Sequence, residues 1–195
     1  MAINANGVIS SLTRPVPTRP KYTQETETDW WACLNGVGRR WVIGRTTEIP
    51  NGGNTGGFGA FRIAGRYLTF EYRWGSRYGL AESGVKQYDL RTGRRTFTTK
   101  YWAGNAIVAE PVGSGASSLV VNAAGNAAWL LNVEEPQSLG IVSVIVHSRM
   151  GTLTLASYEV ELANGAWASP VTGLAITQTS LSWRHDNEEQ TAPVP

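Results

Sequence analysis

The sequence predicts an all-β fold, and three observations support this prediction. Alternating stretches rich in β-branched and aromatic residues recur along the chain, as in YLTFEYRW (67–74), VSVIVHS (142–148) and LTLASYEVEL (153–162). Turn signals containing glycine separate these stretches, and 22 glycines with 9 prolines disfavour long helices. No stretch keeps a helical period, so we expect antiparallel strands joined by short turns.

The expected hairpin turns contain residues that tolerate a positive φ angle. They are Asn35-Gly36, Asn51-Gly52, Thr92-Gly93 and Asn164-Gly165. The glycine-rich segment PNGGNTGGFGAF (50–61) is expected to be a flexible loop between hairpins. It lacks the lysine and the spacing of a phosphate-binding P-loop, which leaves contact with a partner or another copy as its functional alternative.

Two sequence patterns recur at intervals of 55–58 residues. The first pattern comprises FRIAGRYLTF (61–70), LVVNAAGNAAWLL (119–131) and LAITQTSLSW (174–183). The second comprises CLNGVGRRWVIG (33–44), YDLRTGRRTFTT (88–99) and VHSRMGTLTLAS (146–157). Together they predict about three β-meander units of two hairpins each, which must stack because one unit alone would expose an apolar sheet face.

The order of the two patterns predicts how the sheet closes. The chain starts with the second pattern and ends with the first, so we expect the N- and C-terminal hairpins to share a sheet in a β-propeller-like arrangement. A β-sandwich or a barrel is the alternative. The segment YEVELANGAWAS (158–169) adds a further hairpin to the third unit. Residues 1–28 are expected to form an extended N-terminal arm, and residues 29–195 a single all-β repeat domain.

These patterns resemble a group of actinobacterial secreted or surface repeat proteins of unassigned function. The resemblance rests on CLNGVGRRWVIGRTTE, FRIAGRYLTFEY, YDLRTGRR, SLVVNAAGNAAWL and SLSWRHDN, and it spans roughly residues 30–190. It implies a β-propeller-like fold and an extracytoplasmic location. The first 20 residues show no basic region followed by an apolar stretch, the pattern of an export signal. No apolar run reaches the roughly 18–20 residues of a membrane helix.

The sequence shows no catalytic or metal-binding motif. Motifs of serine hydrolases, zinc peptidases and calcium loops are absent, and only three aspartates occur. His147 is expected to be an ordinary strand residue, His185-Asp186 a solvated turn, and the single Cys33 a small buried apolar residue. We therefore predict a protein that is not an enzyme and uses no metal or cofactor, with a hydrolase of unrecognised site as an alternative.

Eight tryptophans give the main functional indication. Trp41, Trp129 and Trp183 are expected in the core. Adjacent strand residues face opposite ways, so one tryptophan of the pair Trp30-Trp31 must point outward or lie under another element. The predicted binding residues are Trp74, Arg73, Arg77, Tyr78 and Trp30. They predict a non-enzymatic binding or assembly module, for which a protein partner or self-association is favoured over a surface glycan.

The charge distribution supports an alternative function. Residues 39–100 contain twelve Lys or Arg against four Asp or Glu, whereas residues 101–195 contain two against eight. This asymmetry fits nucleic-acid or anionic-polymer binding along Arg62, Arg66, Arg73, Arg77, Arg91, Arg94 and Arg95, or head-to-tail contact between copies. The acidic C-terminal part opposes nucleic acid as the partner, so nucleic acid ranks below a protein.

Overall fold

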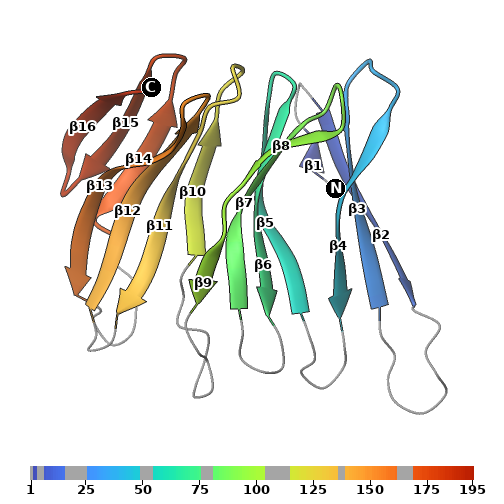
Figure 1. The fold of residues 1–195 in the computed structure, drawn as a ribbon, viewed down its shortest axis with the longest axis horizontal. Coiled ribbons are helices and arrows are strands. Elements are labelled where there is room, and N and C mark those ends of the chain that lie inside the picture. The colour runs from blue at the N-terminus through green and yellow to red at the C-terminus, as the bar shows by residue number, and fades with distance from the viewer. Residues whose placement is uncertain are drawn as a thin grey trace, which may run out of the picture.

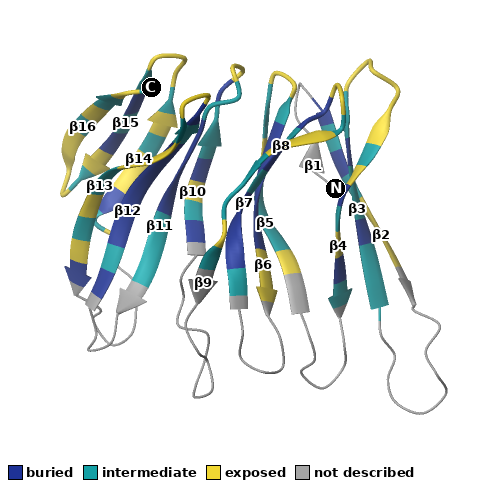
Figure 2. Ribbon diagram, in the orientation of Figure 1, coloured by how far each residue is buried: buried dark blue, intermediate teal, exposed yellow. Residues whose placement is uncertain are grey.

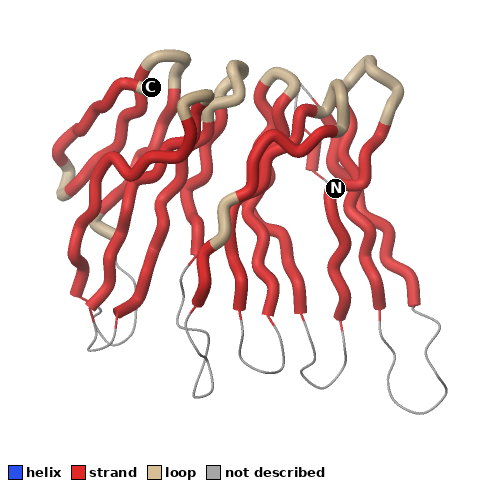
Figure 3. The backbone as a smooth tube through the Cα atoms, in the orientation of Figure 1, coloured by secondary structure: helices blue, strands red, loops and turns tan. Residues whose placement is uncertain are grey.

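The computed structural model describes residues 2–3, 7–15, 26–48, 55–75, 81–103, 115–135, 139–161 and 169–195. These ranges contain sixteen strands and no helix, which confirms the predicted all-β class (Figure 3). Within this part of the chain, no helix is long and apolar enough to cross a membrane. The strands form four antiparallel sheets, which we number in chain order.

The first sheet contains strands that the sequence placed in an arm. Its order is β1 (Ala2–Ile3), β2 (Gly7–Pro15), β3 (Thr26–Leu34) and β4 (Arg40–Glu48). Strand β2 pairs with β3 along its full length, from Gly7 opposite Leu34 to Pro15 opposite Thr26. The expected arm over residues 1–28 is therefore wrong, because Ile9 is buried between sheets and β2 covers the backbone edge of β3.

The remaining three sheets are also meanders. The second sheet has the order β5 (Thr55–Ala64), β6 (Tyr67–Gly75), β7 (Ala81–Asp89) and β8 (Arg94–Thr98), and β9 (Tyr101–Ala103) also pairs with β7. The third has β10 (Gly115–Val121), β11 (Ala127–Glu135), β12 (Leu139–Ser148) and β13 (Gly151–Glu161). The fourth has β14 (Val171–Ile176), β15 (Ser180–His185) and β16 (Glu188–Pro193).

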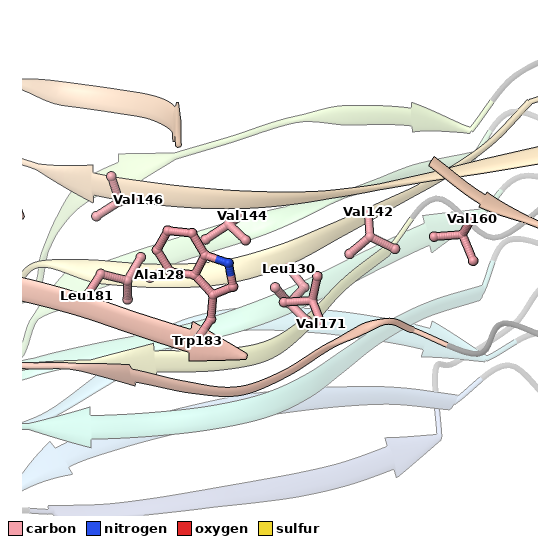
Figure 4. Close-up of a cluster of buried hydrophobic side chains, with 9 residues drawn as sticks. All are labelled: Ala128, Leu130, Val142, Val144, Val146, Val160, Val171, Leu181 and Trp183. Carbon is pink, nitrogen blue, oxygen red and sulfur yellow. The ribbon is translucent and has the colours of Figure 1, made fainter. Parts of the chain in front are cut away.

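The four sheets stack face to face in chain order, from the first at one side to the fourth at the other (Figure 1). Three buried apolar clusters fill the three spaces between them. The second and third sheets are therefore covered on both faces, and Figure 2 shows the buried residues concentrated along their strands. Figure 4 shows the cluster between the third and fourth sheets, where Trp183 lies against valines of β12.

The expected shared sheet between the chain ends is wrong. Among the described strands, none of the first sheet pairs with one of the fourth, and the two sheets lie at opposite ends of the stack (Figure 1). The physical reason is that each end supplies its own missing strand. Strand β2 completes the first sheet, and β16 fills the edge beside β15 that the N-terminal hairpin was expected to take. The chain consequently has four sheets in place of about three units.

The three stretches of the first sequence pattern adopt the same local structure. Each forms the hairpin between the first and second strands of its sheet. A β-bulge precedes each turn, and the bulges contain Ala60, Ser118 and Gly173, all at positive φ (25°, 53° and 65°). A bulge bends the strand and increases its twist, so the three hairpins leave their sheets in a similar way.

Two further expectations need correction. Residues 55–61 of the expected glycine loop belong to β5, because Gly57 and Gly59 pair with Arg73 and Glu71 of β6. Residues 50–54 lie outside the described part. The expected extra hairpin is also not separate, since residues 158–161 continue β13 and Tyr158 pairs with Val142 of β12. Residues 162–168 of that segment lie outside the described ranges.

Candidate functional site

The hairpin turns at one end of the stack carry a group of arginines. Turns 35–39, 65–66, 90–93 and 149–150 all lie at this end, the upper end in Figure 1, which we call the turn end. The arginines on these turns or at the start of the next strand are Arg39, Arg66, Arg91, Arg94, Arg95 and Arg149, and all are exposed. Arg40 differs, because its guanidinium lies over the Trp31 ring, 5.0 Å from the centroid.

Contacts between turns of neighbouring sheets hold the turn end together. The indole Nε1 of Trp41 in the first sheet donates a hydrogen bond to the carbonyl of Leu90 in the second, at 2.9 Å. Asn122 of the third sheet donates through Nδ2 to the carbonyl of Thr177 in the fourth. Gly65 packs on Ala123 of the third sheet. The arginines therefore project from one connected set of turns.

Among the described residues, Arg66 alone of these arginines forms a salt bridge with a carboxylate. Arg66 Nε lies 3.3 Å from Asp89 Oδ2, and another guanidinium nitrogen donates to the Tyr67 hydroxyl at 2.9 Å. The Tyr67 hydrogen bond and then the Asp89 charge raise the pKa of Arg66. No carboxylate of the described residues forms a salt bridge with the other five. Their charges remain open to solvent, so the turn end has a positive potential.

The opposite end of the strands carries most of the carboxylates of the last three sheets. They are Glu82, Glu159, Asp186, Glu188 and Glu189, alongside the cations Arg73, Lys100 and Arg184. Lys100 is neutralised there by Glu82, at 3.1 Å. The charge asymmetry that the sequence shows along the chain is thus also an asymmetry between the two ends of the strands.

A hollow of about 360 Å³ opens between the second and third sheets at the turn end. Its lining includes Tyr67, Gln87, Thr96, Asn126, His147 and Arg149. This lining combines an aromatic ring, amide and hydroxyl groups and an arginine. Such a combination suits a polar ligand with a negative charge better than an apolar one.

Gln87 builds the floor of this hollow. It is only 2% exposed, and its Nε2 donates to Thr69 Oγ1 at 2.9 Å and to the Gly125 carbonyl at 3.0 Å. Its Oε1 accepts a hydrogen bond from Thr96 Oγ1 at 2.8 Å. Because these bonds join β6, β7, β8 and the β10–β11 turn, Gln87 fixes the second sheet against the third.

His147 forms one wall of the hollow at the end of β12. Its Nδ1 lies 2.7 Å from Thr152 Oγ1, and its ring lies 3.8 Å from the centroid of Phe97. Burial lowers the pKa of His147 below its ordinary value, so the ring is neutral at pH 7. The sequence prediction of an ordinary strand residue agrees with its place in β12, although its side chain borders the hollow.

The structure separates the binding residues that the sequence grouped together. Trp74 and Arg73 are exposed near the end of β6, away from the turn end, and Trp74 is 46% exposed. Arg77 and Tyr78 lie outside the described residues. Trp30 packs in the space between the first two sheets, 5.6 Å from Phe58. Trp30 is thus the member of the pair that lies under another element, and Trp31 takes the outward position.

Among the described residues, no three of His, Cys, Asp and Glu gather in a way that could hold a metal ion. His185 Nε2 lies 3.5 Å from Asp186 Oδ2, but Asp186 sits in an exposed turn. Cys33 is half-buried rather than buried. A hollow of about 290 Å³ on the fourth sheet is lined by Thr172, Gly173, Ser182, Trp183, Arg184 and Glu189.

A scan against protein-family models gives no match to this chain, and searches of curated proteins and of solved structures give none either.

The sequence contains a signal for the turn end. Gly-Arg-Arg follows a predicted turn at residues 38–40 and again at 93–95. When consecutive meanders stack, the turns on the same side of each meander lie at one end of the stack. The repeated Gly-Arg-Arg turns therefore predict that these arginines lie close together. Arg149 lies on the corresponding turn of the third sheet.

Proposed function

We propose that this protein is a non-enzymatic binding module whose turn end binds a linear polyanion, a polymer carrying repeated phosphate or sulfate groups. The observation that supports this proposal is the set of six exposed arginines on connected turns, of which only Arg66 forms a salt bridge within the described part of the chain. Arginine suits such a ligand because its planar guanidinium forms paired hydrogen bonds with oxyanions.

The hollow beside these turns supplies a second element of recognition. A polymer that follows the turns passes Arg149 and Tyr67 at the rim of the hollow. The Asn126 amide in this lining can donate hydrogen bonds to hydroxyls of the polymer or accept hydrogen bonds from them. The charges of the arginines would then provide the affinity, and contacts in the hollow would provide a preference among polyanions.

The dependence on salt gives the first test. A ligand that engages about four of the arginines releases a similar number of counterions, so affinity should fall about 50-fold between about 50 and 200 mM salt. Fluorescence polarisation with a labelled single-stranded oligonucleotide and a labelled sulfated oligosaccharide of equal charge measures this fall. The difference between the two probes identifies the preferred polymer.

A matched pair of variants gives the second test. The double variant Arg94→Gln/Arg149→Gln removes two charges from the turn end, and Arg73→Gln/Arg184→Gln removes two exposed charges elsewhere. We expect the first to weaken binding about tenfold and to lower the salt slope by about two. The control should bind almost normally. Equal losses in both variants, or no binding of either probe at low salt, would refute the proposal.

Trp74 supports a second candidate, contact with a protein or a neutral glycan through its ring. The side chain is 46% exposed on β6, and exposed tryptophans are enriched where proteins bind partners. If a protein or a neutral glycan binds through Trp74, its affinity does not depend on salt and the variant Trp74→Ala abolishes binding. For the polyanion, Trp74→Ala should leave affinity unchanged, so the same titrations distinguish the two candidates.

A further inference from the structure

The aromatic rings of the turn end are covered by neighbouring groups. The Arg40 guanidinium lies over the Trp31 ring, 5.0 Å from its centroid. The backbone of Gly93 lies so close to the Trp41 ring that an added Cβ would overlap it. Of the aromatic side chains whose exposure the structure describes, Trp74 alone is exposed, and it lies away from the turn end.

The rings that border the hollow are covered as well. Arg66 lies over the Tyr67 ring, 5.0 Å from its centroid, and Gly125 packs against the same ring. The rings of Phe97 and His147 pack on each other, with their centroids 3.8 Å apart. Proteins hold unpaired bases by stacking them on exposed aromatic rings. The described part of the turn end presents no such exposed ring, so its composition disfavours a single-stranded nucleic acid.

The hollow instead offers hydrogen-bonding groups beside a positive charge. The Asn126 amide borders it, and Arg149 lies at its rim. The Tyr67 hydroxyl accepts a hydrogen bond from Arg66 at 2.9 Å, so its own hydrogen remains available to donate. A sugar ring that carries an anionic group combines neutral hydroxyls with a negative charge. The lining of the hollow is therefore complementary to an anionic sugar.

The spacing of the sheets fits a polymer of such sugars. Packed sheets lie about 10 Å apart, which is close to the length of one disaccharide unit in an extended polysaccharide. The turns of the first three sheets carry Arg39, Arg66 and Arg149, respectively. A polysaccharide with one anionic group in each disaccharide unit can therefore present one charge to each of these sheets. The phosphates of a nucleic acid recur at every nucleotide, which is a shorter interval.

We propose that the polyanion bound by the turn end is an anionic polysaccharide, one of whose sugar rings occupies the hollow. This inference rests on the proposed function and names the class of polymer. Sulfate or phosphate groups on the sugars bind the arginines through paired hydrogen bonds. Ring hydroxyls bind Asn126 and Tyr67 in the hollow. A nucleic acid gains the charge contacts without a surface on which its bases can stack.

Four labelled probes of equal charge test this inference with the full chain. They are a sulfated oligosaccharide, an oligothymidylate, the same oligonucleotide without its bases, and inorganic polyphosphate. In fluorescence polarisation at about 50 mM salt, the oligosaccharide should bind at least about fivefold more tightly than each of the other three. Removal of the bases should change affinity by less than about twofold, whereas each stacked base would contribute at least about fivefold.

A substitution in the hollow separates the sugar contact from the charge contacts. Asn126→Ala removes the side-chain amide, while the backbone NH of residue 126 keeps its bond to Asn122 Oδ1. The variant should bind the oligosaccharide about threefold to tenfold more weakly and polyphosphate as before. The matched control is Gln178→Ala, which removes an exposed amide from the uncharged turn 177–179 of the fourth sheet, outside the hollow. This control should bind all four probes like the unmodified chain.

The possible results distinguish this inference from the proposed function. A smaller preference for the oligosaccharide, or a loss of at least about fivefold when the bases are removed, overturns the inference. Unchanged oligosaccharide binding in Asn126→Ala, or an equal loss for polyphosphate, overturns it as well. In each of these cases, salt-dependent binding of the probes leaves the proposed function standing. If none of the four probes binds at low salt, the proposed function fails and the inference fails with it.

Discussion

Replacement of Gly93 by alanine isolates the effect of one close contact between sheets. Gly93 has a φ of 70°, and a Cβ added there would overlap the indole ring of Trp41 on the first sheet. An L-residue at such a φ costs about 1–2 kcal/mol, and overpacking adds about 1–3 kcal/mol. The ring cannot turn away freely, because its Nε1 donates to the Leu90 carbonyl at 2.9 Å.

Gly38 is a control for the backbone term. Its φ is 68°, and a Cβ there would meet nothing within 4 Å. In urea unfolding followed by circular dichroism, Gly38→Ala should lose about 1–2 kcal/mol and Gly93→Ala about 2–5 kcal/mol. The two losses should differ by at least about 1 kcal/mol. Equal losses would show that the indole moves at no cost and that our account of this contact is wrong.

Two further predictions concern the hollow between the second and third sheets. Gln87→Leu should lower the free energy of unfolding by about 2–4 kcal/mol in urea titrations, because it leaves the Gly125 carbonyl and the Thr69 hydroxyl without their buried amide donor. His147 has a lowered pKa in the folded chain, so the unfolded chain binds its proton more readily, and stability should decrease as the pH falls below about 6.5. His147→Gln should reduce this decrease, whereas the control variant His185→Gln should keep it; a decrease of the same size in His147→Gln would contradict the assignment.

The local structure follows closely from the sequence. Alternation predicted β6, β12 and β13, and the glycines of the turns at 36, 38 and 93 all have positive φ. Hydrophobic alternation and φ preference are properties of neighbouring residues, so they can be recognised without knowledge of the fold. The buried Trp129 and Trp183, at 0% and 5% exposure, were expected for the same reason.

The arrangement of the sheets was less predictable. The first sheet depends on the pairing of β2 with β3, which are separated by residues 16–25. The short stretch VISSL within β2 belongs to neither repeated pattern, so the repeats do not identify it as a strand of this sheet. Strand β15 could pair with β16 or with an N-terminal strand. The outcome depends on competition between these two strands, which are far apart in sequence. Local patterns contain no information on such a competition.

In the candidate site too, local features are predictable from the sequence and the arrangement of the sheets is not. The sequence shows the arginines after Gly38 and Gly93 as parts of a repeat, but only the stacking of the sheets brings them to one end of the molecule. Trp30 and Trp31 illustrate the reverse case. Alternation showed that they face opposite ways, and only the packing of Phe58 against Trp30 decides which one is covered.

Because each apolar cluster joins only two adjacent sheets, the architecture is modular along one dimension. A meander could be added or deleted at the polar fourth sheet while the other layers keep their contacts. In evolution, such a chain can change length in steps of one hairpin pair, and its charged turns then multiply along a single rim with every added layer.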